Sequence, residues 1–465
     1  MDTLSNTAHM RPPSQISLKQ RVFNASIWSL AGYGCNQLLR FGSNLLMTRL
    51  LVPEMFGVMA IAGVVITGLA MFSDLGFKPN VVQSKRGSDP VFLNTIWVIQ
   101  IFRGFLLWFL ALMASLLILS ANHIGMVPRG SVYADPKLPF VVAILSITAV
   151  AGGFESTKLL QASRNMSLYR IAWIEVTTQI AAVICMIGWA SLDRSIWALV
   201  AGGICSTVAR TILSHAWLPG VPNHWQWDNS AFHEIFHFGK WMFVSSIIGF
   251  FVNSGDRLLL STFFDRNMLG VYVIAFLIYG SFEQALTKII NEVSFPALSE
   301  VVRERLLHLK SSYYKLNLVI ASVAYFCSGF LMISGPTLIG LLYDRRYGQA
   351  GWMLATLSAA LVTIPLRAAQ LCFLSLESPK IYTHLIIIRV IALFTLTPIG
   401  FRFFGPAGAI GGIVAAYFSN VPAILFYNIK HGLFDFRKEL LMLTALPIGM
   451  IIAGAFDLAA GYLKH

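Results

Sequence analysis

Charged side chains are scarce in this sequence. Asp, Glu, Lys and Arg together make up 12% of the 465 residues, whereas hydrophobic residues make up 56%. Soluble domains usually carry about 25% charged residues, and the mean hydropathy here is +0.69. No polar stretch between the apolar runs is long enough for a separate soluble domain. The composition therefore predicts a single domain embedded in a membrane.

Several signals of catalysis and processing are missing as well. The five cysteines all lie inside apolar runs, where they are expected to pack as small hydrophobes rather than to form disulfides. No Walker A pattern occurs, so no cofactor is expected, and an ion gradient or the substrate's own gradient is the expected energy source. Residues 1–20 are polar and precede no short apolar core with a cleavage site, so a cleaved signal peptide is not expected.

Long apolar runs are what the sequence has in abundance. The net charge of +13 follows their predicted topology, because with a cytoplasmic N-terminus about 18 Lys and Arg fall on the inner side and about 10 on the outer side. The basic loops lack interleaved aromatic residues, so nucleic acid is not an expected partner. A helix needs about 20 apolar residues to cross a bilayer, and thirteen such spans are predicted at 23–48, 56–73, 95–120, 138–160, 171–192, 196–218, 238–262, 268–297, 316–342, 350–374, 380–400, 405–429 and 440–460.

A repeated pattern indicates an internal duplication. Met55-Phe56-Gly57-Val58 recurs as Met268-Leu269-Gly270-Val271, at an offset of 213 residues. Six predicted spans separate equivalent positions, so both copies would cross the membrane in the same direction, as a parallel repeat. We expect an all-α polytopic fold of about 12 to 14 spans, with two pseudo-symmetric six-helix lobes around a central cavity. The expected divisions are 1–218 (first lobe), 219–237 (linker), 238–429 (second lobe) and 430–465 (cytoplasmic loop and an additional helix).

A motif at Arg49, Pro53 and Gly57, followed by Asp74 and Gly76, resembles that of a known transporter group. This is the polysaccharide transporter group, which includes the O-antigen (Wzx-like) flippases, of the multidrug/oligosaccharidyl-lipid/polysaccharide exporter superfamily. The resemblance implies a flippase of the bacterial inner membrane for undecaprenyl-pyrophosphate-linked oligosaccharide repeat units. It further implies alternating access, contact with membrane lipids, and a glycan polymerase and glycosyltransferases as partners.

Ionisable residues inside the predicted spans are the candidates for function. Each costs a few kcal/mol or more at mid-bilayer unless it faces a cavity or a partner. Basic residues outnumber acidic ones there, which favours an anionic ligand over a cationic drug, and arginine can bind phosphate through two parallel hydrogen bonds. We predict that one central cationic cavity binds the pyrophosphate through Arg40, Arg210, Lys288, Arg367 and Arg389. The remaining intramembrane charges are Arg103, Glu175, Asp256, Glu283 and Glu292, of which Asp256 and Glu283 are the candidates for ion coupling.

Local explanations stay open for some of these residues. Lys288 and Glu292 are four residues apart on one predicted helix face and can pair with each other. Pro365 should kink its span just before Arg367 and free backbone groups, although helix packing alone tolerates such a proline.

An enzyme is the alternative from a different class. His233, Glu234 and His237 spell H-E-x-x-H, the pattern of zinc proteases. No third ligand is identifiable and the sequence contains no Asp-Gly dipeptide, so neither a metal site nor an enzyme is expected. The short loops also disfavour a membrane glycosyltransferase or polymerase. Another exporter of the same superfamily, for drugs or for lipid-linked peptidoglycan precursors, is the alternative within the transporter class.

Overall fold

The computed structural model describes residues 18–128, 130–304, 308–376 and 379–462. Within these ranges the chain forms helices and no strand, apart from an isolated bridge between Ser131 and Asp265. The first half contains α1 (Leu18–Leu50), α2 (Pro53–Met71), α3 (Phe77–Gln83), α4 (Pro90–Ile124), α5 (Leu138–Leu145), α6 (Ile147–Gly153), α7 (Lys158–Arg164), α8 (Leu168–Leu192) and α9 (Trp197–Ala216). The second half contains α10 (Asn229–Phe263), α11 (Arg266–Ile289), α12 (Phe295–Glu304), α13 (Leu309–Leu342), α14 (Ala350–Ser358), α15 (Pro365–Leu376), α16 (Pro379–Phe418), α17 (Val421–Lys430), α18 (Phe436–Leu443) and α19 (Ala445–Tyr462).

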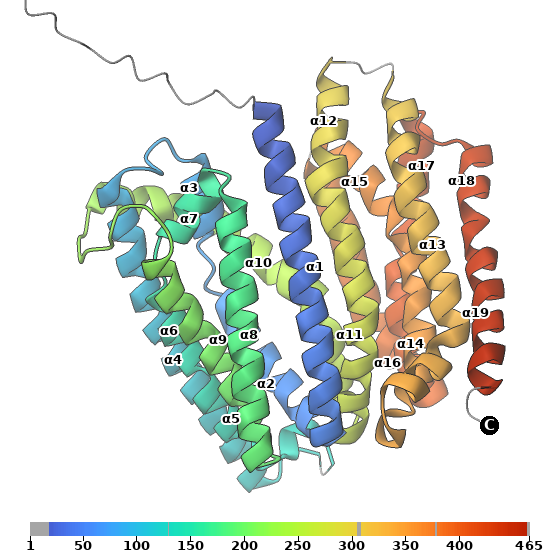
Figure 1. Ribbon diagram of the computed structural model, residues 1–465, viewed down its shortest axis with the longest axis horizontal. Coiled ribbons are helices and arrows are strands. Elements are labelled where there is room, and N and C mark those ends of the chain that lie inside the picture. The colour runs from blue at the N-terminus through green and yellow to red at the C-terminus, as the bar shows by residue number, and fades with distance from the viewer. Residues whose placement is uncertain (1–17, 129, 305–307, 377–378, 463–465) are drawn as a thin grey trace, which may run out of the picture.

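The number of spans lies in the predicted range. Ten helical segments of the described chain are long and apolar enough to cross a membrane, and the bent unit of α5, α6 and α7 supplies an eleventh. The segment Thr383–Lys430 consists of two spans. The chain reverses at Gly405, which has φ +61°. The helices before and after this reversal pack closely, because a Cβ at Gly400 would overlap the carbonyl oxygen of Gly408. With α1, which runs the height of the bundle in Figure 1, the described residues hold thirteen spans. The start of α1 and the end of α19 accordingly lie at opposite ends of the bundle.

Two groups of helices form the lobes, with α2–α9 on one side of Figure 1, α11–α19 on the other, and α1 and α10 between them. Where α2 crosses α11, a Cβ at Gly57 would overlap the carbonyl oxygen of Arg266, and a Cβ at Gly270 would overlap that of Pro53. Adding the offset of 213 residues converts Gly57 to Gly270 and Pro53 to Arg266, so each contact is the counterpart of the other. A two-fold axis produces such reciprocal contacts. This crossing supports the internal repeat.

The lobes are joined at the end of the bundle where α1 finishes, which we name the closed end. Arg266 forms a 2.9 Å ion pair with Asp135, and Asn267 donates a 2.9 Å hydrogen bond to Glu54. Each of these contacts joins a residue of the N-terminal lobe to the first turn of α11. These two contacts hold the N-terminal lobe and α11 together at this end.

α10 begins earlier than predicted, which corrects the expected linker. The predicted linker extends to residue 237, whereas α10 begins at Asn229. The helix starts there because the Asp228 carboxylate accepts hydrogen bonds from the backbone N–H groups of Ser230 and Ala231. Arg86 of the N-terminal lobe also donates to Asp228 at 3.0 Å. Hydrogen bonds from the Ser230 hydroxyl and from Arg86 lower the pKa of Asp228 to about 2. The first turns of α10 are therefore docked on the N-terminal lobe.

Two local breaks in the helices shape the interior of the C-terminal lobe. Pro365 begins α15 after the 3-10 turn Ala359–Thr363, so the predicted break before Arg367 is confirmed. A π-helical turn, Ile290–Ser294, interrupts the passage from α11 to α12, and such turns are frequent at functional sites. Both breaks contribute residues to the cavity of the C-terminal lobe.

Candidate functional site

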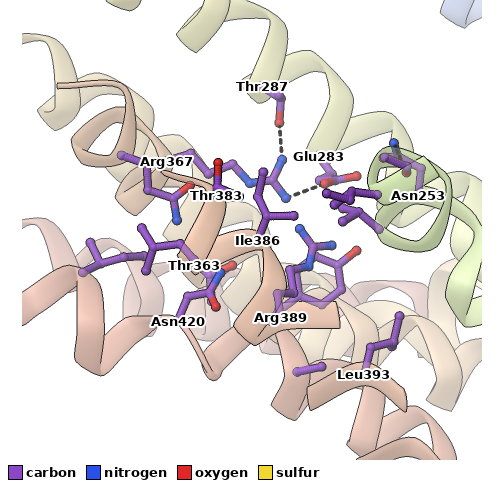
Figure 2. Close-up of a pocket in the computed structure, with 18 of the residues that line it drawn as sticks. Asn253, Glu283, Thr287, Thr363, Arg367, Thr383, Ile386, Arg389, Leu393 and Asn420 are labelled. Carbon is purple, nitrogen blue, oxygen red and sulfur yellow. Dashed lines mark hydrogen bonds and ion pairs between the residues drawn. The ribbon is translucent and has the colours of Figure 1, made fainter. Parts of the chain in front are cut away.

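A cavity of about 800 Å³ lies inside the C-terminal lobe, and we name it the C-lobe cavity. Residues of α10, α11, α15, α16 and α17 line it, together with the two local breaks. Figure 2 shows many of these side chains directed into one space. A polar lining inside apolar helices is typical of a binding site in a membrane protein. Its charged residues are Asp256, Glu283, Arg367 and Arg389, and its amides, hydroxyls and rings include Asn253, Asn291, Gln370, Asn420, Thr287, Thr363, Thr383, Trp241, Phe276 and Tyr417.

Arg367 is held on the cavity wall by two partners on α11. Its Nη2 lies 2.6 Å from Oε1 of Glu283, and its Nη1 donates to the hydroxyl of Thr287 at 2.8 Å (Figure 2). The Arg367 and Glu283 side chains are only 21% and 16% exposed, so the pair is largely withdrawn from water. Donation through two nitrogens fixes the plane of the guanidinium. Arg367 thus neutralises Glu283, one of the two candidates for ion coupling.

Arg389 is the cation of this cavity that has no carboxylate partner. Among the described residues no carboxylate oxygen lies within 4.0 Å of its guanidinium. The guanidinium instead lies over the ring of Tyr417, 3.9 Å from the centroid, and such a cation–π contact orients the group without removing its charge. Figure 2 shows it pointing toward the space beside Arg367 and Glu283. Arg389 is therefore placed to contact an anionic ligand.

Asp256, the other candidate for ion coupling, is also engaged. Its Oδ2 accepts a 2.5 Å hydrogen bond from the hydroxyl of Tyr272 and lies 3.9 Å from Nε of Arg257. Each carboxylate of the C-lobe cavity therefore has a basic neighbour. The lining of the C-lobe cavity carries two arginines and two carboxylates, so it does not show the predicted excess of positive charge, and Arg389 is its one cation without a carboxylate within 4.0 Å among the described residues.

Arg40 lies in a second cavity, of about 340 Å³, which we name the inter-lobe cavity. Residues of α1 and α2 line one part of it and residues of α10 and α11 the other, so both halves of the chain form its walls. Arg40 and Arg257 line it, and its described lining contains no carboxylate. Phe276 is the one described residue that lines both cavities. The structure thus places Arg40 in a space adjoining the one that holds Arg367 and Arg389.

The other two predicted cations have carboxylate partners away from these cavities. Arg210 forms an ion pair with Glu155 inside the N-terminal lobe. Glu155 lies within the span predicted at 138–160 but is not among the predicted intramembrane charges. Lys288 lies 3.8 Å from Glu292, the local pair left open above, and donates to the backbone carbonyl of Ser29 on α1. Of the five predicted cations, two share the C-lobe cavity and three lie elsewhere.

Comparison with known proteins gives the family. The model of a family described as "Polysaccharide biosynthesis protein" matches residues 46–350. The chain belongs to this family. The lipopolysaccharide biosynthesis protein WzxC of Escherichia coli (strain K12) is 21% identical over 347 residues, which cover 72% of this chain and 65%, just under two thirds, of WzxC. A Shigella flexneri protein provisionally assigned as an O-antigen transporter is 25% identical over 70% of this chain and 75% of that protein.

Solved structures with similar folds cover most of this chain. An inward-facing multidrug resistance transporter of the MATE family and the MOP superfamily matches with a TM-score of 0.62 at 14% identity, covering 88% of this chain and 98% of that one. A MATE structure in complex with MaL6 matches with a TM-score of 0.61 at 17% identity, covering 89% and 96%. These likenesses establish the fold: an all-helical, multi-pass membrane protein.

Four of the five motif residues lie at contacts between the two halves of the chain. Asp74 accepts 2.8 Å hydrogen bonds from the backbone N–H of Gly76 and from the hydroxyl of Ser246 on α10. Gly76 has φ +63°, and a Cβ there would overlap a side chain of α10. Pro53 and Gly57 lie at the crossing with α11. These motif residues pack one lobe against the other and do not line the C-lobe cavity.

The H-E-x-x-H residues His233, Glu234 and His237 lie in the first turns of α10 and line neither cavity. The Glu234 carboxylate accepts a 2.6 Å hydrogen bond from the hydroxyl of Ser84. No group of three potential metal-binding side chains occurs among the described residues. Glu234 thus helps to dock α10 on the N-terminal lobe.

Removing Arg367 is expected to destabilise the protein. Arg367→Ala leaves Glu283 with little exposure and no counter-charge. Breaking a buried pair costs about 3–5 kcal/mol, and the remaining exposure of this pair lowers that cost. Arg367→Ala/Glu283→Ala should recover most of that loss, because no unpaired charge is left. Thermal unfolding of the purified variants in detergent measures both effects, and Arg389→Ala, which breaks no ion pair, is the control. Equal instability of the single and double variants would contradict the pairing argument.

Proposed function

We propose that this protein is a flippase that moves undecaprenyl-pyrophosphate-linked oligosaccharide repeat units across the bacterial inner membrane. Membership of the polysaccharide biosynthesis protein family and similarity to WzxC support this substrate class. The observation that carries the proposal is Arg389, a cation inside a membrane bundle with no described carboxylate within 4.0 Å of its guanidinium. Such a charge is costly unless an anion or water meets it, and a pyrophosphate matches the donor geometry of arginine.

The rest of the C-lobe cavity supports a glycan head group. Amides such as Asn253 and Asn420 and hydroxyls such as Thr287 supply donors and acceptors for sugar hydroxyls. The rings of Trp241 and Tyr417 offer flat apolar surfaces beside them. In this proposal the head group crosses inside the protein, while the polyprenyl tail stays in the surrounding lipid.

Transport proceeds, in this proposal, by alternating access between the two lobes. The ion pair Arg266–Asp135 and the hydrogen bond from Asn267 to Glu54 hold the closed end. Rocking of one repeat against the other would break these contacts and close the opposite end, so the head group would face each side in turn. The transporter relatives and the transporter fold support this mechanism over a zinc protease.

A transport assay tests the proposal. In proteoliposomes that contain the purified protein, a lipid-linked oligosaccharide loaded into the inner leaflet should become accessible to a membrane-impermeant glycosidase faster than in empty liposomes. The same vesicles should not accumulate or expel a cationic dye. Dye transport without movement of the glycolipid would contradict the flippase and would favour a multidrug exporter of the same superfamily.

We also propose that the N-terminus and the basic segment 78–86 face the cytoplasm, because clustered Lys and Arg are retained on that side. Lys85 is exposed and follows α3, which lies near the end of the bundle where α1 begins (Figure 1). Arg194 is exposed in the connection from α8 to α9, which lies at the closed end. With the native cysteines replaced, Lys85→Cys should resist a membrane-impermeant maleimide in intact cells and react after permeabilisation. Arg194→Cys should react in intact cells. The reverse pattern would invert the topology.

A further inference from the structure

The connection from α9 to α10, residues 217–228, is held on the N-terminal lobe although it contains no helix. The side chain of Asn94 on α4 donates a 3.0 Å hydrogen bond to the side chain of Gln226. The same side chain accepts a 3.1 Å hydrogen bond from the backbone N–H of His224. Asn94 is itself buried, so these two bonds fix the connection against α4.

Three tryptophans of this connection project away from the protein. Trp217, Trp225 and Trp227 are 54%, 65% and 47% exposed. The Trp225 ring packs edge to face on Phe102 of α4, with the ring centroids 5.7 Å apart, and Phe102 is itself exposed. Exposed aromatic rings gathered on one surface mark an interaction site.

α4 shows where the bilayer ends. Most of its side chains from Pro90 to Ile101 are buried. Beyond them, one face of the helix exposes apolar side chains at helical spacing, namely Phe102, Phe105, Leu106, Phe109, Leu110, Met113, Leu116 and Leu117. At about 1.5 Å per residue, roughly 33 Å separate Phe102 from Ile124 at the end of α4, close to the ~30 Å hydrocarbon thickness of a bilayer. Phe102 therefore lies at one boundary of the hydrocarbon layer.

α9 gives an independent measure of the same boundary. This helix begins near the closed end and runs toward the end of the bundle where α1 begins. By the same rise per residue, about 30 Å separate Trp197 at its start from Trp217 at its C-cap. Trp217 and the Trp225–Phe102 contact thus lie at one depth, where the hydrocarbon layer meets the lipid head groups.

We propose that Trp217, Trp225 and Trp227 form a docking surface for the phospholipid head-group layer, on the side of the membrane where α1 begins. The occupant is lipid rather than a protein, because Trp225 continues the lipid-facing stripe of α4 at its boundary. An indole suits this layer, since its ring is apolar and its N–H is polar. The proposal is independent of the substrate. With the proposed topology, the surface contacts the cytoplasmic leaflet.

This lipid contact belongs to the N-terminal lobe. Only Trp352 of the eleven tryptophans follows Trp241 in the sequence. It lies near the start of α14, a few residues after Tyr347, whose hydroxyl donates a 3.1 Å hydrogen bond to the carbonyl of Leu51 just beyond α1. That position is at the closed end, opposite to the proposed surface. Because Asn94 holds the connection on the N-terminal lobe, the docking surface moves with that lobe.

Quenching by brominated phospholipids tests the docking surface. The full chain is placed in lipid nanodiscs, and the fluorescence of Trp225→Phe/Trp227→Phe is subtracted from that of the parent, so that the difference reports these two rings. Lipids brominated near the head group should quench the difference signal more strongly than lipids brominated near the chain ends. No quenching by either lipid would place the rings in water, and stronger quenching by the deep bromines would place them among the tails. Either result would overturn the proposal.

Collision rates of spin labels give a second measurement with matched controls. With the native cysteines replaced, labels are attached at Trp225→Cys, at Lys85→Cys as the exposed control in water, and at Phe109→Cys as the control on the lipid-facing stripe. The ratio of collisions with oxygen to collisions with a water-soluble nickel chelate should be several-fold higher at Trp225→Cys than at Lys85→Cys, and highest at Phe109→Cys. Equal ratios at Trp225→Cys and Lys85→Cys would overturn the docking surface. Neither measurement requires transport, so failure of the proposed function leaves both results unchanged.

Discussion

Replacing Arg389 with Glu is expected to abolish glycan export in cells that contain the variant at normal membrane levels. The change removes a charge-assisted contact worth about 1.5–3 kcal/mol, which corresponds to roughly a 10- to 150-fold loss of affinity. It also adds a third carboxylate to a cavity that already contains Glu283 and Asp256, so a pyrophosphate would meet net negative charge. Arg389→Lys should restore export partially, because it keeps the charge but loses the two-point donor geometry.

Arg210 supplies the matched control for this prediction. It is also an arginine inside a span, but it pairs with Glu155 and lines neither cavity. Arg389→Gln and Arg210→Gln each remove one guanidinium, and only the former should reduce complementation of surface glycan. Immunoblots of the membrane fraction distinguish lost transport from lost protein. Normal export by Arg389→Glu at normal abundance would show that Arg389 has a structural role.

The architecture follows from local sequence features. The count of apolar runs predicts thirteen spans, because each run must bury its own backbone hydrogen bonds in lipid. The division between the spans predicted at 380–400 and 405–429 is real, because Gly405 adopts the positive φ that the reversal requires. Pro365 breaks its span as expected, because proline cannot donate the helical hydrogen bond.

The grouping of the charges does not follow from sequence. Arg210 and Glu155 are 55 residues apart, and Arg367 and Glu283 are 84 residues apart, so only the packing of different helices brings them together. The sequence also does not predict that Arg40 and Arg389 lie in two different cavities, which share Phe276 in their walls. The start of α10 illustrates two conflicting sequence signals. Asp228 is a typical N-cap residue and indicates a helix start, whereas the polar composition of the segment predicts a linker.

Locking the closed end with a disulfide is expected to stop transport completely. Ser131 and Asp265 form an antiparallel bridge between the lobes, and Cα atoms of such pairs are about 4.5–5.5 Å apart, within the range that a disulfide spans. In the cysteine-free background, Ser131→Cys/Asp265→Cys should therefore cross-link under mild oxidation. If the lobes must part at this end during each cycle, the oxidised protein should be inactive in proteoliposomes.

Reduction of the same sample provides the internal comparison. Dithiothreitol should return transport to the rate of the unoxidised double variant, and each single variant should keep its rate under oxidation, because it has no partner thiol. The Asp265 side chain also caps α11 by accepting a hydrogen bond from the backbone N–H of Met268, so the unoxidised double variant sets the reference rate rather than the parent. Undiminished movement of the glycolipid by a sample with its disulfide fully formed would mean that the closed end stays shut throughout the cycle. In that case the head group must leave the protein by another route, and alternating access through this end is wrong.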